Sequence, residues 1–353
     1  MSERIEPLST SSSSHLNKQA AEQLGSSRQQ ALNMPQLTER LLQGEIAALS
    51  QGITLIESTR QSHKELAEKL IEACLPSSGN SFRLGITGVP GVGKSTFIEA
   101  LGLLAVAKGH KVAVLAVDPS STQSGGSILG DKTRMAQLST HPKAYIRPSA
   151  SGQSLGGVAR KTREAIMLCE AAGFDFIIVE TVGVGQSETV VHSMVDFFLL
   201  LKLSGAGDEL QGIKRGIIEM ADAIAINKAD GDRVQAAQEA KSAFAKALHL
   251  YPPKESSWQP KVVTCSALQH TGIEELYSLL SNYREQMEAN GFFVEKRKEQ
   301  NKYWLLQTID QQLGQQFYDH PKVKKALPKV LEAVSQQELS PFRAANQLLA
   351  LLH

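Results

Sequence analysis

The residues best suited to chemistry form one short run early in the chain. Residues 88–96 read G-V-P-G-V-G-K-S-T, fit the pattern G-x-x-x-x-G-K-[ST], and follow the apolar run 82–86. Glycines in such a loop let backbone N–H groups turn inward around phosphate oxygens, and the helix that follows adds the positive end of its dipole. In this pattern Lys94 reaches the β- and γ-phosphates, and the Ser95 hydroxyl ligates Mg²⁺. The run predicts a nucleotide site but does not distinguish ATP from GTP, and every residue in it is a candidate contact: Gly88, Val89, Pro90, Gly91, Val92, Gly93, Lys94, Ser95 and Thr96.

A second polar run could read the base. Asn227-Lys228-Ala-Asp230 directly follows the apolar strand candidate 221–226. The Asp230 carboxylate can accept hydrogen bonds from the N1–H and exocyclic amine of guanine, whereas adenine would leave the acid unpaired in a desolvated pocket. We expect Asn227 to tie this run to the phosphate loop and the Lys228 stem to cover one face of the base.

A third segment completes the predicted base pocket. The strand candidate 261–265 ends in Ser266, Ala267 and Leu268, whose backbone is expected to meet the guanine O6. An N-K-x-D run alone is a weak signal, because these residues also form ordinary turns. Its position after a strand, in this order and with a Ser-Ala strand end downstream, predicts GTP rather than ATP.

Two further strand candidates end in carboxylates. The unalternating apolar runs 111–117 and 174–179 are typical of strands buried on both faces of a parallel sheet. Ligands of doubly wound folds gather at the carboxyl ends of strands, so Asp118 and Glu180 are expected to face the phosphates. They are candidates for holding Mg²⁺ or orienting the attacking water, and Asp131 is a third candidate magnesium ligand. For each acid, a helix N-cap or solvated loop position is the alternative.

One absence bears on the rate of hydrolysis. In Ras-like GTPases a Gln follows the strand-end glycine and positions the water. Here Val184 occupies that position, and Gln186 comes two residues later. We therefore expect slow intrinsic hydrolysis that awaits a partner or a rearranged loop.

Together, these motifs and several longer segments resemble the MeaB/ArgK-type GTPases of the G3E group, from about residue 37 to the C-terminus. The resemblance implies a chaperone that gates adenosylcobalamin loading and protects adenosylcobalamin-dependent acyl-CoA mutases, chiefly methylmalonyl-CoA mutase. An older family label, a kinase of arginine or ornithine transport, is the weaker alternative. The segments that carry the resemblance are D-P-S-S at 118–121, G-G-S-I-L-G-D-K-T-R-M at 125–135, E-T-V-G-V-G-Q at 180–186 and G-A-G-D-E-L-Q-G-I-K-R-G at 205–216.

The resemblance also assigns roles to the loops. It implies a first switch at 118–131, a second at 180–186 and a third at 205–215, with Lys214 as a relay between nucleotide and mutase. It thereby adds Lys214 to Lys94, Asp118 and Glu180 as a candidate catalytic residue. Without the resemblance, residues 205–216 could equally be a flexible strand-to-helix connection. The residues alone predict a GTPase with mobile loops and name no partner.

Composition narrows the class further. The 353 residues carry a net charge of +1, which gives no electrostatic case for nucleic-acid or membrane binding. The apolar stretch 194–203 is too short to span a bilayer. Nine scattered His and three Cys without C-x-x-C spacing argue for a reducing compartment and against a metal-insertion GTPase, the third alternative. We expect a cytoplasmic protein, or one of the mitochondrial matrix if the source is eukaryotic.

The pattern along the chain predicts four regions. Residues 1–34 are polar and Ser-rich and predict a disordered tail, and the apolar spacing within 35–78 predicts two amphipathic helices. Residues 79–290 are expected to form an α/β P-loop domain around a mostly parallel, doubly wound sheet. Residues 291–353 have helical spacing, and the resemblance implies that these helices build a homodimer.

Overall fold

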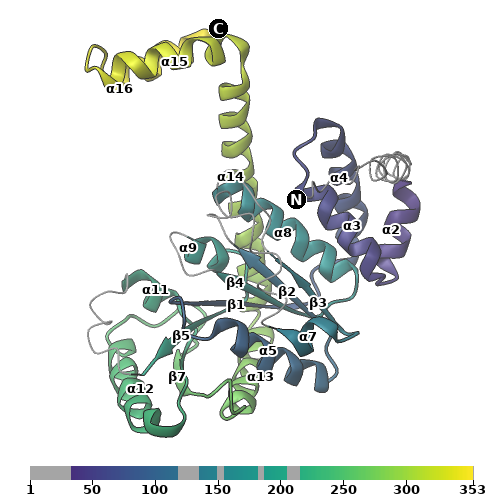
Figure 1. Cartoon of the computed structure of the whole chain (residues 1–353), viewed down its shortest axis with the longest axis vertical. Coiled ribbons are helices and arrows are strands. Elements are labelled where there is room, and N and C mark those ends of the chain that lie inside the picture. Colours follow the sequence, from purple (N-terminus) through teal and green to yellow (C-terminus); the bar gives the residue numbers. More distant parts are fainter. Residues whose placement is uncertain (1–32, 118–134, 149–154, 182–186, 205–214, 353) are drawn as a thin grey trace, which may run out of the picture.

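The computed structural model describes residues 33–117, 135–148, 155–181, 187–204 and 215–352 (Figure 1). In these ranges the strands form one seven-stranded sheet with the order β3-β2-β4-β1-β5-β6-β7. Every neighbouring pair is parallel. The strands are β1 (Phe82–Gly88), β2 (Val112–Val117), β3 (Ala144–Arg147), β4 (Phe176–Thr181), β5 (Phe197–Leu203), β6 (Ala223–Asn227) and β7 (Lys261–Thr264).

The central strands are buried on both faces, as their unbroken apolar sequences predict. All residues of β1, β2, β4 and β6 are buried. Parallel neighbours need helical crossovers, and the helices therefore lie on both faces of the sheet. The helices before and between the strands are α2 (Met34–Leu42), α3 (Ile46–Glu57), α4 (Gln61–Cys74), α5 (Lys94–Ala107), α7 (Ala136–Thr140), α8 (Leu155–Ala171), α9 (Ser187–His192), α11 (Arg215–Met220) and α12 (Val234–Leu248).

Alternate strand residues divide the core into two layers. On one face, Leu84 and Ile178 pack with Phe97 of α5 and with Leu276 of α13 (Ile273–Ala289). On the other face, the strand residues that alternate with these, such as Val179, pack beneath α8, α9 and the N-terminal helices. This confirms the prediction of a doubly wound P-loop fold with helical extensions.

The N-terminal extension contains three helices among the described residues, where the apolar spacing predicted two. Gly44, with φ of +81°, separates α2 from α3. A Cβ on Gly44 would lie 3.0 Å from the Ala172 carbonyl oxygen. The apolar stripe nevertheless continues through Leu41 and Leu49, both fully buried, so periodicity alone did not reveal the break. Short 3₁₀ turns complete the chain at η1 (Leu75–Ser77), η2 (Gly231–Arg233) and η3 (Ala350–Leu352).

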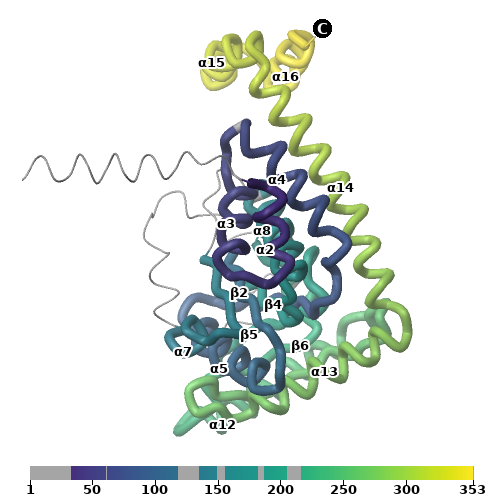
Figure 2. Tube along the Cα trace, turned by 90° about the vertical axis from the view of Figure 1, so that its right-hand side faces the viewer, coloured from purple at the N-terminus to yellow at the C-terminus, as the bar shows by residue number. Residues whose placement is uncertain are grey.

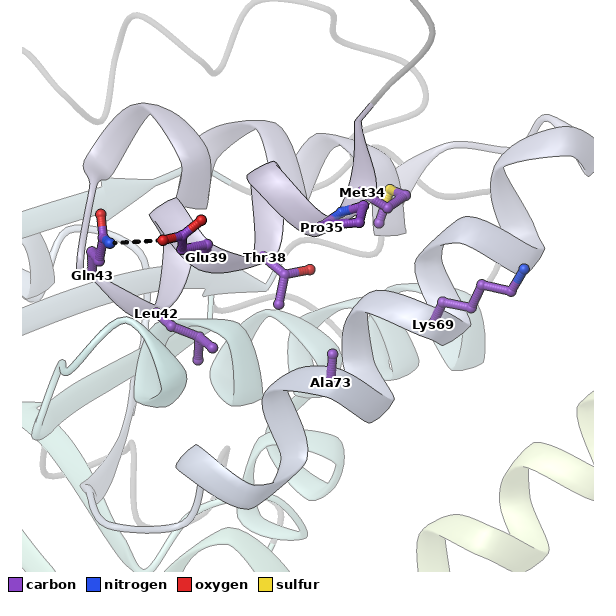
Figure 3. Close-up of a pocket in the computed structure, with 8 residues that line it drawn as sticks. All are labelled: Met34, Pro35, Thr38, Glu39, Leu42, Gln43, Lys69 and Ala73. Carbon is purple, nitrogen blue, oxygen red and sulfur yellow. Dashed lines mark hydrogen bonds between the residues drawn. The ribbon is translucent and has the colours of Figure 1, made fainter.

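The C-terminal helices leave the body of the molecule. Helix α14 (Phe292–Asp319) contacts α13 and α8, and its last turns continue outward beyond the sheet (Figure 1). Figures 1 and 2 show α15 (Pro321–Ser335) and α16 (Pro341–Leu349) at its far end, away from the sheet. Figure 3 shows a surface hollow in the N-terminal extension, between α2 and α4, lined by residues that include Leu42 and Ala73. Within the described residues, none of the helices is long and apolar enough to cross a membrane. The predicted region boundaries at 34, 78 and 290 stay predictions.

Candidate nucleotide site

The phosphate loop runs from the end of β1 into α5, and its glycines are required by backbone geometry. Gly91 and Gly93 have φ of +80° and +92°, a region that side chains disfavour. A Cβ on Gly93 would lie 2.9 Å from the Asn227 side-chain nitrogen. At Gly88, a Cβ would lie 2.7 Å from the Leu201 carbonyl oxygen. The loop therefore bends tightly, so that its backbone amides and the N-terminus of α5 face the space that the loop encloses.

Lys94 closes this curl. Its Nζ donates to the Gly88 carbonyl at 2.7 Å and to the Val89 carbonyl at 3.3 Å. Burial lowers the pKa of Lys94, whereas the carboxylates of Glu180 and Glu188 raise it. A partly desolvated ammonium at a helix N-terminus is a strong attractor for phosphate oxygens, because its charge is poorly screened there.

Two buried carboxylates act on Lys94. Glu180 lies in β4, at the carboxyl edge of the sheet as predicted, and is 6% exposed. Glu188 lies in the first turn of α9 and is 8% exposed. Glu188 was not among the predicted site residues, because it lies just beyond the motif at 180–186. The sequence feature that could have indicated Glu188 is an acidic residue at the start of a helix, directly after the glycine motif that ends a strand. Close by, the Thr87 and Thr181 hydroxyls join β1 to β4 at 2.8 Å.

On the base side, Asn227 makes the expected link between the two loops. Its Nδ2 donates to the Val92 carbonyl at 2.8 Å, and its Oδ1 accepts from the Ala267 amide at 3.1 Å. Lys228 has φ of +60° and donates from Nζ to the Gly91 carbonyl at 2.8 Å. One buried amide side chain therefore holds the phosphate loop and both base-reading segments in a fixed arrangement.

Asp230, the predicted base-reading acid, is oriented by a hydroxyl. Ser266 Oγ donates to Asp230 Oδ2, and the same Oγ accepts from the Gln269 amide at 3.2 Å. Leu268 lies in this turn and is 77% exposed. Behind it, Gly272 has φ of +73°, and a Cβ there would lie 2.4 Å from the Thr264 carbonyl oxygen. The structure thus brings together the predicted segments 88–96, 227–230 and 266–268.

The remaining predicted site residues cannot be placed. Asp118, Asp131 and Lys214 lie outside the described residues, as do Val184 and Gln186. Among the described residues, no group of three or more His, Cys, Asp or Glu side chains could hold a metal ion. Mg²⁺ needs no such group beside a nucleotide, because phosphate oxygens and water fill most of its coordination sphere. Ser95 and Glu180 supply the hard oxygen donors that Mg²⁺ prefers.

An all-parallel sheet with a phosphate loop at its carboxyl edge and a guanine-type acid beside it defines a P-loop GTPase. The family described as "Methylmalonyl Co-A mutase-associated GTPase MeaB" matches residues 49–322. The chain therefore belongs to the MeaB family, which confirms the resemblance inferred from its motifs and identifies it as a GTP-hydrolysing enzyme.

Individual relatives agree. "GTPase ArgK" of Escherichia coli is 46% identical over 309 residues, covering 88% of this chain and 93% of that protein. "Methylmalonic aciduria type A homolog, mitochondrial" of Mus musculus is 46% identical over 319 residues, covering 88% and 77%. A solved structure described as "Crystal structure of LAO/AO transport system kinase" superposes with a TM-score of 0.72 at 39% identity, covering 90% of this chain and 97% of the other.

Proposed function

We propose that this GTPase is a chaperone for an adenosylcobalamin-dependent acyl-CoA mutase of the methylmalonyl-CoA mutase type. It would assist cofactor loading and protect the loaded enzyme. The family description, which names methylmalonyl-CoA mutase, supports the partner. The proposed binding of a guanine nucleotide is supported by the hydrogen bond from Asn227 to the Val92 carbonyl, which fixes the Asp230 segment against the phosphate loop.

In this proposal the nucleotide site works by positioning and charge. The amides of 88–96 and the Lys94 ammonium would hold the β- and γ-phosphates, and Asp230 would pair with the donor edge of guanine. Ser95 and Glu180 would hold Mg²⁺, together with Asp118 and Asp131. The ion, when bound, neutralises charge that develops on the phosphates. Because no Gln directly follows Gly183, we propose a low intrinsic rate.

The GTP and GDP states would then bind the mutase differently. A ligand shifts a conformational equilibrium only by its differential affinity for the two states, so the γ-phosphate must change a surface that the mutase contacts. We assign that surface to the segments that resemble switches, with Lys214 as the relay.

The client is tested with a purified apo-mutase and adenosylcobalamin. Cofactor loading, followed by the absorbance of the cobalamin, should depend on this chain and differ between GTP and GDP. Lys94→Ala, which removes the phosphate-binding charge, is the matched control and should respond to neither nucleotide. Loading that is indifferent to this chain under all conditions would refute the chaperone role while leaving GTP hydrolysis intact.

We further propose a homodimer built by the C-terminal helices. Exposed large apolar side chains concentrate on α14–α16, beyond the body of the protein, and contiguous exposed apolar surface commonly marks an interface. Light scattering at micromolar concentration should give about twice the 38.3 kDa chain mass; a single 38.3 kDa species would refute the dimer. The side chains concerned are Leu305, Leu306, Ile309, Leu313, Tyr318, Leu331, Phe342 and Leu349.

A kinase of arginine or ornithine transport is the second candidate, and the description of the solved relative as a transport system kinase favours it. It requires phosphoryl transfer to an acceptor other than water. Incubation with labelled GTP or ATP and either amino acid separates the two functions. Labelled inorganic phosphate alone supports the GTPase chaperone, and a labelled acceptor supports the kinase.

We propose the cytoplasm as the location.

A further inference from the structure

Helix α14 is attached to the short connection between α9 and β5 by three side chains on one of its faces. Trp304 Nε1 donates to the Ser193 carbonyl at 3.2 Å, and Gln300 Nε2 donates to the Val195 carbonyl at 2.9 Å. Lys296 Nζ donates to the Asp196 carbonyl at 2.7 Å. The three donors are spaced four residues apart and so share a helix face. We call these three hydrogen bonds the α14 ladder.

Ion pairing anchors the ladder at its inner end. Arg297 donates from Nε to Asp196 Oδ1 at 2.9 Å and from Nη2 to Asp196 Oδ2 at 2.7 Å, a bidentate pair. The Arg83 amide donates to the same carboxylate at 2.8 Å, which ties the pair to β1. Asp196 is 1% exposed, so this end of α14 is fixed to the sheet. By contrast, Gln300 and Trp304, the two outer rungs of the ladder, each donate a single hydrogen bond to the connection between α9 and β5.

The opposite end of α9 lies at the nucleotide site. Helix α9 spans only Ser187–His192, and its first turn carries Glu188, whose carboxylate acts on Lys94. A γ-phosphate adjacent to Lys94 adds negative charge that repels Glu188 and competes for the ammonium. This repulsion acts on a six-residue helix, and the connection that follows the helix carries the three carbonyls of the α14 ladder.

The corner where these elements meet leaves space for movement. A cavity of about 1190 Å³ borders it; most of its lining is the end of α12 and the connection from α12 to β7, and His192 of α9, Met220 of α11 and Lys296 of α14 line the rest together with a few neighbours. Tightly filled interiors resist displacement, whereas helix ends that face open space can shift without overlapping their neighbours. Both helices that line this corner therefore have room to change position against α14.

We propose that α9 and the α14 ladder form a link through which the bound nucleotide sets the order of the C-terminal arm, residues 305–352. The link deepens the proposed function and rests on it, because it takes GTP and GDP as the ligands. In the GTP state, repulsion at Glu188 shifts α9 and the 193–196 connection, and the ladder transmits the shift to α14. The arm, which carries the exposed apolar side chains, is thereby coupled to the γ-phosphate without contacting it.

Hydrogen–deuterium exchange of the full chain tests the link, with GDP or a non-hydrolysable GTP analogue at saturation and no mutase present. Exchange in peptides from 305–335 should differ by roughly fivefold between the two nucleotides, the lower end of common coupling strengths. Gln300→Leu removes one rung and should abolish the difference. Trp304→Phe removes the outer rung but keeps a ring beneath Arg163, and it serves if Gln300→Leu does not fold.

Lys302→Gln is the matched control, since Lys302 lies on the same stretch of α14 but pairs only with Glu299, at the surface. It should keep the full nucleotide difference. The link is wrong if wild-type peptides exchange equally in both states, or if the ladder variants retain the difference. GTP hydrolysis measured on nucleotide-free portions of the same protein preparations separates the two ideas: lost hydrolysis counts against the GTPase, whereas intact hydrolysis with an unresponsive arm counts against the link alone.

Discussion

Asn227 donates from Nδ2 to the backbone carbonyl of Val92 at 2.8 Å, and both residues are almost fully buried. The bond joins the strand end that leads to Asp230, the proposed base-reading acid, with the loop that we propose encloses phosphate. A nucleotide bound here would contact both segments at a spacing set before it arrives. Binding therefore requires little ordering of these two segments, which lowers its entropic cost.

Asp230→Asn should convert the base preference from guanine toward xanthine. The carboxylate accepts from Ser266 Oγ and has one edge available for a donor pair, whereas an amide can donate to the additional xanthine carbonyl. A polar group left unpaired when the base displaces its water costs roughly 3 kcal/mol, so GTP affinity should fall by about a hundredfold. Calorimetric titration with GTP and XTP measures both changes. The control is Asp232→Asn, in the exposed turn η2, and unchanged GTP affinity in Asp230→Asn would overturn the pocket assignment.

Lys94→Ala should abolish hydrolysis without unfolding the domain. The ammonium donates to two loop carbonyls, at 2.7 and 3.3 Å, and Lys94 belongs to none of the hydrophobic core clusters of the described residues. Loss of a preorganised charge of this kind lowers the rate by about 10²–10³-fold. Single-turnover GTP hydrolysis and thermal unfolding should be measured together. Lys108→Ala, at the other end of α5, should leave both unchanged; a Lys94→Ala variant that still hydrolyses GTP normally contradicts the site.

Glu188→Gln should move the alkaline limb of the pH–rate profile to lower pH. Burial lowers the pKa of Lys94, and Glu180 and Glu188 oppose that effect. Removing one carboxylate lowers the pKa of Lys94 further, so the ammonium is lost earlier as pH rises. The measurement is kcat/KM for GTP as a function of pH. An exposed acid, Glu274, provides the control as Glu274→Gln; an unshifted limb would show that Glu188 does not act on Lys94 during turnover.

Acid should destabilise the fold through His192. Burial lowers its pKa from 6.5 to about 4; Lys296 and Lys254 add to this effect, and Asp222 opposes it. Because the folded chain binds this proton more weakly than the unfolded chain, the stabilisation is complete above pH 6.5 and is lost as pH falls toward 4. The loss amounts to about 3 kcal/mol at most.

Urea unfolding at several pH values measures this dependence. His192→Gln should flatten the stability profile between pH 6.5 and 4, where His192 titrates only in the unfolded chain. The exposed His270 provides the control as His270→Asn, which should retain the wild-type slope. Equal slopes in His192→Gln and the wild type would show that His192 is not the group responsible.

The site was largely predictable because its parts are local in sequence. The phosphate loop, Asn227 and Glu180 each lie at the carboxyl end of a strand, and the carboxyl ends of parallel strands meet at one edge of a sheet. Glu188 escaped prediction because its effect on Lys94 depends on how α9 packs over the loop. Its position at a helix start, after a strand-end glycine motif, indicates an acid near the site but does not show that this acid acts on Lys94.

The long-range polar contacts could not be predicted from the sequence, for a different reason. Arg297 and Asp196 are 101 residues apart, and neither belongs to a motif. Gln300 reads as an ordinary polar position on an amphipathic helix, yet it is 8% exposed. Partners of this kind are selected by tertiary packing, and helical periodicity indicates only that a face is buried.

The α14 ladder also constrains how chain length can vary. One residue inserted between Lys296 and Trp304 would turn the rest of the helix by about 100°, because an α-helix has 3.6 residues per turn. The indole would then point away from the Ser193 carbonyl that it now reaches at 3.2 Å. We therefore expect a change of length to be tolerated only near the outer end of α14, well beyond Trp304, where a change of phase alters the direction of α15 and α16 but breaks none of these three hydrogen bonds.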